Sequence, residues 1–192
     1  YKRQFQGRAS MCGNLCNASP AADTVPALIA AGATCALAGP GGRREVPVEE
    51  ICTGPGQTIL TDGEFVVSIL LPARGSRSGD AYLRFIPRTE MDIAVVDAAA
   101  RISLDEKGHC KEAIIAIGAA APTVIRVPEA EIILHGKKIN DQLLAEVMEA
   151  ASTACNPIND KRGTVEYRRQ VAGVLAKRVI LLAEKRALDK KG

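Results

Sequence analysis

The hydrophobic pattern divides the chain into a strand-rich first block and a second block in which strands give way to helices. In the first block, an Ala- and Leu-rich segment over residues 24–33 is typical of a short helix. The predicted strands of this block cover residues 33–38, 43–48 and 64–71. The first two flank the glycine-rich turn 39–42 and therefore predict a β-hairpin. Gly54-Pro55-Gly56 predicts a second turn.

The second block opens with strands. Its predicted strands cover residues 81–87, 93–104, 110–118 and, at an edge, 123–127. Within the second of these, Ala100, Ile102 and Leu104 alternate with polar neighbours, which is the period of a half-buried strand. The polar turn 105–108 then predicts a hairpin with the strand that follows.

Helical spacing of apolar residues begins at Pro128. The first helix is expected to end at Gly136, and the second to begin at an Asp141 cap and end before Asn156. The apolar face predicted for the second helix consists of Leu143, Leu144, Val147, Met148 and Ala151. The last helix is expected over about residues 165–186, with a buried stripe of Val171, Val174, Leu175, Val179 and Leu182.

Strands followed by three helices favour an α+β fold for the second block. The best linker is the segment 73–80, which is polar, rich in Gly and Ser, and lacks an apolar anchor. It predicts two domains, residues 1–75 and residues 80–192.

The composition is that of an ordinary globular protein and gives no sign of nucleic-acid binding, membrane binding or secretion. The 192 residues are 47% hydrophobic and 24% charged, which is ordinary for a globular chain. Since 25 basic residues face 22 acidic ones, the net charge of +3 does not favour binding to nucleic acid or a membrane surface. No apolar run reaches the length of a membrane span, and no signal peptide is visible.

The six cysteines form neither a CxxC pair nor a cluster with zinc spacing. We therefore expect reduced thiols, a cytoplasmic protein and no metal site. His109 and His135 each stand alone in a turn-like context, and no Ser/His/Asp arrangement is present. The sequence thus predicts no catalytic side chain of its own.

The polar run over residues 10–23 is the most informative stretch for chemistry. Its small residues let a ligand approach the backbone, and Gly13 tolerates backbone angles that other residues resist. Asp23 suits the cap of the helix that follows. Free N–H groups beside a helix N-terminus favour an anion. A plain polar loop that caps a helix fits the same residues.

This run, Ser-Met-Cys-Gly-Asn and then a polar stretch to Asp23, resembles the second FAD-binding loop in the flavoprotein subunit of molybdenum hydroxylases. These are the xanthine dehydrogenase and carbon monoxide dehydrogenase type enzymes, which usually carry Thr-Ile-Gly-Gly-Asn there. Further matches follow in the same order at residues 4–9, 54–58, 81–85, 91–94 and 166–169. The resemblance covers essentially the whole chain. It implies the β-rich second lobe of an FAD-binding domain, followed by the family's C-terminal domain, which is an antiparallel sheet packed on a three-helix bundle.

The resemblance also implies which residues contact the FAD. Ser10, Met11, Cys12, Gly13 and Asn14 would lie against the cofactor, Asp23 would hydrogen-bond to it, Val66 would form an apolar backstop, and Arg84 would stand where relatives place a Lys near the isoalloxazine. Ordinary roles also fit: Asp23 as a helix cap, Phe65 beside Val66 as strand core, and Arg84 as a solvated strand residue.

Cys12 departs from the family pattern, which has glycine at this position. If the position requires a positive φ, a cysteine costs about 1 kcal/mol or more, and Cys12→Gly would strengthen FAD binding. If it requires only close approach, the small thiol fits beside the phosphate.

For function, the resemblance implies an oxidoreductase subunit that passes electrons through FAD to NAD or another acceptor. The electrons would come from an iron–sulfur subunit, and the substrate would react on a molybdopterin-containing large subunit. The chain lacks the family's first lobe, which carries the other glycine-rich FAD loop, so we expect that lobe as a further partner. The alternative is a flavin-free interaction or assembly module of such a complex.

Overall fold

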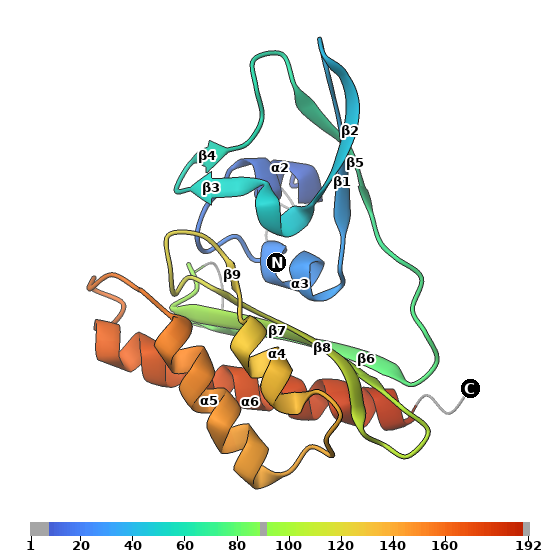
Figure 1. Ribbon diagram of the computed structural model, residues 1–192. Helices are drawn as coiled ribbons and strands as arrows, with labels where there is room; N and C mark the ends of the chain where they lie inside the picture. Colours follow the sequence, from blue (N-terminus) through green and yellow to red (C-terminus); the bar gives the residue numbers. More distant parts are fainter. Residues whose placement is uncertain (1–7, 89–91, 190–192) are drawn as a thin grey trace.

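The computed structural model describes residues 8–88 and 92–189. Two parts lie one above the other in Figure 1. The N-terminal part contains helices α2 (Met11–Cys16) and α3 (Val25–Ala30), strands β1 (Thr34–Gly39), β2 (Gly42–Pro47), β3 (Cys52–Gly54), β4 (Gln57–Thr58) and β5 (Phe65–Leu70), and the 3-10 turn η1 (Val48–Glu50). Its main sheet is antiparallel in the order β2-β1-β5, so the predicted hairpin of residues 33–48 is confirmed.

The C-terminal part is an antiparallel sheet covered by three helices. The strands run in the order β6-β7-β8-β9 and are followed by helices α4, α5 and α6. The bounds are β6 Ser78–Phe85, β7 Val96–Leu104, β8 Cys110–Gly118, β9 Ile125–Arg126, α4 Pro128–Leu134, α5 Asp141–Ala154 and α6 Val165–Asp189. The α+β expectation, with an antiparallel sheet on three helices, is confirmed.

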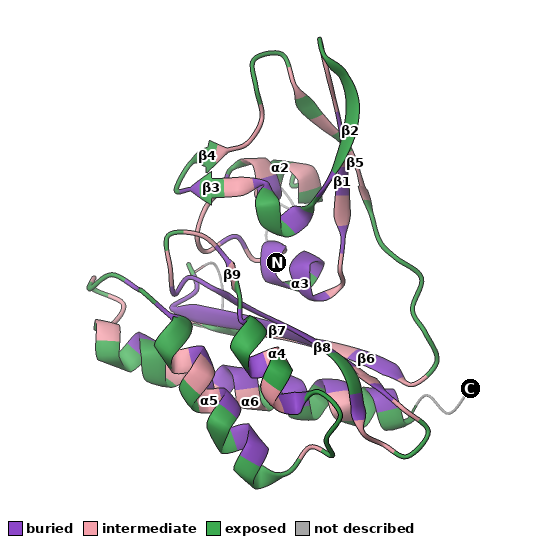
Figure 2. Cartoon of the chain, viewed as in Figure 1, coloured by how far each residue is buried: buried purple, intermediate pink, exposed green. Residues whose placement is uncertain are grey.

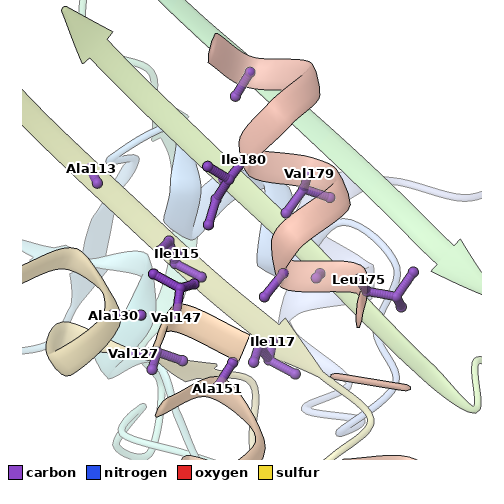
Figure 3. Close-up of a cluster of buried hydrophobic side chains, with 14 of the residues drawn as sticks. Ala113, Ile115, Ile117, Val127, Ala130, Val147, Ala151, Leu175, Val179 and Ile180 are labelled. Atoms are coloured by element: carbon purple, nitrogen blue, oxygen red, sulfur yellow. The ribbon is translucent and has the colours of Figure 1, made fainter. Parts of the chain in front are cut away.

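Alternation along the strands gives this sheet two different faces. Ala100, Ile102 and Leu104 are buried as predicted, and together with Ile115 and Ile117 they pack against the helices. Figure 3 shows this core, in which Val147 lies near Ile115 of β8 and Val179 lies on α6, the helix that packs on β6 and β7. The opposite face meets α3, and there Ile114 and Ala116 join the core of the N-terminal part. The sheet is therefore buried on both sides.

The buried face of α6 differs from the predicted stripe. Leu182 is 38% exposed and Val171 and Val174 are half-buried, whereas Leu175 and Val179 are buried as expected. Small residues make up most of the buried face: Ala172, Gly173, Ala176, Ala183 and Ala187. They let the helix backbone come close to its neighbours. A Cβ on Gly79 of β6 would collide with the carbonyl oxygen of Ala183.

Several sequence-predicted boundaries also need correction. Helix α3 is shorter than residues 24–33, because Gly32 adopts a left-handed φ of 69° just past its end. Asp141 is the first residue of α5, and the Asn140 side chain makes the cap by accepting from the backbone N of Leu143 at 2.9 Å. The segment 73–80 is a connector only in its first part, since Ser78 and Gly79 are buried in β6. Residues 4–7 and Met91, which belong to the motifs quoted above, lie outside the described residues.

Gly79→Ala should destabilise the protein by about 2 kcal/mol or more, because the added methyl meets the backbone of α6 rather than a flexible side chain. Chemical denaturation would measure the loss. Gly75→Ala is the matched control, since a Cβ there meets nothing within 4 Å and neither glycine has a positive φ. Equal stability of the two variants would show that the backbones of α6 and β6 are not closely packed at Gly79.

Candidate functional site

The first part of the run expected to be a loop is a short helix. Ser10 caps α2, and its Oγ accepts from the backbone N of Gly13 at 3.0 Å. Leu15 is fully buried and anchors the helix in the core. Neither Cys12 nor Gly13 has a positive φ, so the loop assignment and the strain argument at Cys12 are both wrong. Cys12→Gly would therefore relieve no strain.

The start of α2 nonetheless offers what a phosphate group needs. The backbone N–H groups of Met11 and Cys12 are in the first turn, where no intrahelical acceptor exists. Ser10, Met11 and Gly13 are exposed, and Cys12 is half-buried. These residues therefore fit a pyrophosphate, which is bound by exposed N–H groups at small residues.

Asn14 has a structural role in the described contacts. Its Oδ1 accepts from the backbone N of Thr24 at 3.1 Å and from the Thr24 hydroxyl at 2.6 Å. Thr24 is the N-cap residue of α3, so Asn14 fixes α2 against the start of the next helix. Asp23 is not the cap that the sequence predicted.

Asp23 instead pairs with Arg84, which is 61 residues away in the sequence. The Arg84 Nη1 donates to the Asp23 Oδ2 at 2.5 Å. Arg84 lies on β6, near the edge of the four-stranded sheet, and about a third of its side chain is exposed. Two site residues implied by the resemblance therefore meet, one from each part of the fold.

Val66 and Phe65 occupy β5, a strand that contacts α2. Val66 is half-buried and packs against the N-terminal core. The strand-core interpretation of Phe65 is wrong, since its side chain is 60% exposed, and Val67 and Leu71 are exposed as well. Figure 2 shows the exposed stretches along β5 and β2, which contrast with the buried strands β7 and β8. Because neighbouring residues of a strand project to opposite faces, Val66 points toward the core that α2 joins, whereas Phe65 points to the outer face of β5.

A buried acid, for which the sequence gives little signal, lies beside this site. Asp97 of β7 is fully buried, and its Oδ2 accepts from the Tyr82 hydroxyl at 3.1 Å. Burial, as the main cause, raises the pKa of the Asp97 carboxyl to about 7, with a smaller increase from nearby Asp23. Burial likewise raises the pKa of Tyr82, so its hydroxyl stays protonated. The available signal was a single Asp inside the apolar run Val-Val-Asp-Ala-Ala.

A hollow with a volume of about 300 Å³ is lined by residues 19–21, between α2 and α3, and by residues 156–158, between α5 and α6. Pro20, Ala21 and Ile93 belong to its largely apolar lining, which also includes Asp160 and Arg168. Its three charged side chains are already paired with one another, because the Arg168 Nη2 donates to the Asp160 Oδ1 at 2.6 Å and the Arg162 Nη1 donates to the Asp160 Oδ2 at 3.4 Å. We therefore place the candidate site at α2, Asp23 and Arg84 rather than in this hollow.

The part of the chain that the structure describes shows neither a metal site nor a membrane-spanning helix. No three His, Cys, Asp or Glu side chains within it are grouped to hold a metal ion. Its helices include none that is both long and apolar enough to span a bilayer. All six cysteines are free thiols.

Two family models cover most of the chain. Residues 2–74 match the FAD binding domain in molybdopterin dehydrogenase, and residues 81–183 match the CO dehydrogenase flavoprotein C-terminal domain. The chain is 31% identical over 178 residues to a putative xanthine dehydrogenase FAD-binding subunit of Escherichia coli K12, covering 92% of this chain and 61% of that protein. It is 30% identical to the carbon monoxide dehydrogenase medium chain of Hydrogenophaga pseudoflava, with the same coverage.

Solved structures agree with the sequence matches. Carbon monoxide dehydrogenase from Hydrogenophaga pseudoflava superposes with a TM-score of 0.91 at 31% identity, covering 95% of this chain and 63% of that one. Quinoline 2-oxidoreductase from Pseudomonas putida 86 gives a TM-score of 0.86 at 29% identity, covering 96% and 64%. The chain thus spans about three fifths of the length of the relatives it matches.

Asp97→Asn should remove a pH dependence of stability. Because the folded protein binds a proton at Asp97 that the unfolded chain releases near pH 4, the free energy of unfolding falls as the pH rises from about 4 to about 7. The slope is about 1.4 kcal/mol per pH unit, about 4 kcal/mol over the window. Denaturation at several pH values would measure the difference between wild type and variant.

The control is Asp80→Asn, which removes a carboxylate from the neighbouring strand on the same face of the sheet. Relative to wild type, the stability of this variant should show no corresponding change over that window. A constant stability difference between wild type and Asp97→Asn from pH 4 to pH 7 would contradict the raised pKa.

Proposed function

Since the chain belongs to the FAD-binding flavoprotein family of the xanthine and carbon monoxide dehydrogenases, we propose that it holds FAD as the electron-transfer subunit of a molybdenum hydroxylase. The observation that carries this proposal is the meeting of Asp23 and Arg84, next to Thr24, which Asn14 of α2 holds by two hydrogen bonds. A helix start with exposed N–H groups and a fixed cation are what a dinucleotide with a redox-active ring requires.

Each part of the site has a distinct task. The N–H groups of Met11 and Cys12 bind the pyrophosphate, and Ser10 holds the helix start in place through its bond to Gly13. Arg84 would supply positive charge to the ring of a bound flavin, and Asp23 fixes the direction of its guanidinium. Val66 on β5 would form the apolar backstop. When bound, the flavin supplies the electron-transfer chemistry, receiving electrons from an iron–sulfur subunit and passing them to NAD or another acceptor.

We propose two subunit partners, the iron–sulfur subunit and the molybdopterin-containing large subunit, together with a complementary FAD lobe, on this or another polypeptide, that supplies the other phosphate loop. The greater length of the relatives supports the last of these. The exposed side chains of Phe65, Val67 and Leu71 support a covering partner at β5, because apolar groups gathered at a surface mark interaction sites. The free thiols are consistent with a reducing, cytoplasmic compartment.

The 192-residue chain alone should bind FAD at least about a hundredfold more weakly than the chain assembled with the complementary lobe. Two charge-assisted hydrogen bonds to the pyrophosphate, at about 1.5–3 kcal/mol each, account for a loss of that size. Titration with FAD, followed by flavin fluorescence, would measure both affinities. Stoichiometric FAD on a verified monomer of this chain would refute the need for the second lobe.

A colourless assembled protein that still docks to its partners would instead identify a flavin-free assembly module.

Arg84→Gln should weaken FAD binding by about tenfold and make the reduction potential of the bound flavin more negative, because the negative charge gained on reduction loses its cation. Arg74→Gln is the control, since Arg74 pairs with Asp80 at 2.6 Å and is not a site residue. A potential unchanged in Arg84→Gln would show that Arg84 serves the fold alone.

A further inference from the structure

A buried carboxyl lies directly behind the Asp23–Arg84 pair. Asp97 of β7 is the register partner of Arg84 of β6, and opposed residues of an antiparallel pair project on the same face of the sheet. Tyr82, two residues before Arg84 in the same strand, shares that face and donates to Asp97 at 3.1 Å. The proposed function described above gives this acid no task.

The surroundings of Asp97 leave its second oxygen poorly satisfied. Its Oδ1 is buried and forms no hydrogen bond of good geometry within the described residues, and from β8 only the backbone N–H of Gly118 acts on the carboxyl as a donor. On the other neighbouring strand, β8, Gly118 faces the carboxyl, and a Cβ there would collide with Oδ1 and come within 3.0 Å of Pro26 in α3. The absence of a side chain at position 118 therefore leaves room for the acid between β7, β8 and α3.

Few charged groups face Asp97. Tyr82 and Arg84 come from β6, and Asp23 comes from the connection between α2 and α3. Gly118 and the α3 segment Val25–Ala30 contribute no titratable side chain. With Asp97 ionised, Asp23, Arg84 and Asp97 together carry one net negative charge, whereas with Asp97 protonated they are neutral.

We infer that Asp97 is a proton-linked positioning residue for the cofactor site, binding a proton when negative charge arrives beside the Asp23–Arg84 pair and releasing it when that charge leaves. This inference rests on the proposed function, because the arriving charge is taken to be the FAD phosphates and, after reduction, the isoalloxazine. The Asp97 carboxylate takes its proton from solvent and becomes the neutral acid. No electron passes through it.

Two features of the site support this assignment. By linkage, an anion that prefers the neutral cluster must raise the proton affinity of Asp97 by the same factor. Because burial raises the pKa of Asp97 to about 7, both of its forms are populated near neutral pH, where a neighbouring charge can shift their ratio. A carboxyl with an ordinary pKa would stay ionised there whatever was bound.

The first test needs no cofactor. Carboxyl ¹³C NMR on the full chain would follow the titration of Asp97 in wild type, Arg84→Gln and Asp23→Asn. The pKa of Asp97 should rise by about 0.5 pH units or more without the Arg84 cation and fall by a similar amount without the Asp23 anion. Asp80→Asn, on the same face of β6, is the control and should leave it unchanged. A titration unmoved in both site variants overturns the inference.

The second test measures proton uptake when FAD binds to the chain assembled with the complementary lobe. Calorimetry at pH 7 in two buffers of different ionisation enthalpy should show net uptake in wild type and none in Asp97→Asn. The Kd for FAD should rise about fivefold from pH 6 to pH 8 in wild type and stay level in the variant, which is the size expected for one charge near the surface.

The outcomes separate the two proposals. FAD binding without proton uptake, or with equal uptake in Asp97→Asn, overturns the inference and leaves the proposed function standing. Absence of FAD binding at every pH removes the proposed function. In that case the pKa shifts in the cofactor-free variants still decide whether Asp97 senses the charge of the pair.

Discussion

Burial of the four-stranded sheet on both faces is the constraint from which the rest of this structure follows. One face carries the aliphatic residues of β7 and β8 against α4, α5 and α6, and the other must be closed by the N-terminal part. Helix α3 closes it, and Arg101 on β7 fixes the contact by donating to the carbonyl oxygen of Ala31 at 3.0 Å and to Glu112 at 2.8 Å. The two parts are therefore held in one relative position at the face where they meet.

The candidate site lies where polar residues interrupt this apolar contact. On β6 the residues facing the N-terminal part are Ser78, Asp80, Tyr82 and Arg84, so this edge strand is polar on one side and apolar on the other. Asp97 continues the polar side one strand inward. Charged groups of the two parts can thus meet without disturbing either hydrophobic core.

The sequence was sufficient for most elements because each has a local signal. The β1–β2 hairpin, the strand 110–118 and the start of α4 at Pro128 follow from turn residues and from period-2 alternation. Helix α2 was missed because Gly and Asn are poor helix formers, and its stability comes from the Ser10 cap and the buried Leu15. The face of α6 was misjudged because close backbone approach favours alanine where the pattern favours large residues.

The site itself was only partly accessible from the sequence. The resemblance identifies candidate FAD-binding residues. Nothing in the sequence indicates that Asp23 pairs with Arg84, since the contact depends on how the two parts pack. For the same reason the sequence could not show that Asp97 stands opposite Arg84, because register between strands is a property of the folded sheet. The predicted helix cap at Asp23 failed because Asn14 and Thr24 form that junction instead.

Arginine at position 84 has a physical rationale that lysine would not satisfy. A guanidinium has N–H donors on more than one side, so a single side chain can bind a carboxylate and still present charge elsewhere. In the described contacts it donates to Asp23 through Nη1, and about a third of the side chain remains exposed. A lysine ammonium in the same pair would be drawn toward Asp23 as a point charge. If Asp97 binds a proton as proposed, the net charge around the arginine changes by one unit while the bond to Asp23 holds the direction of its guanidinium.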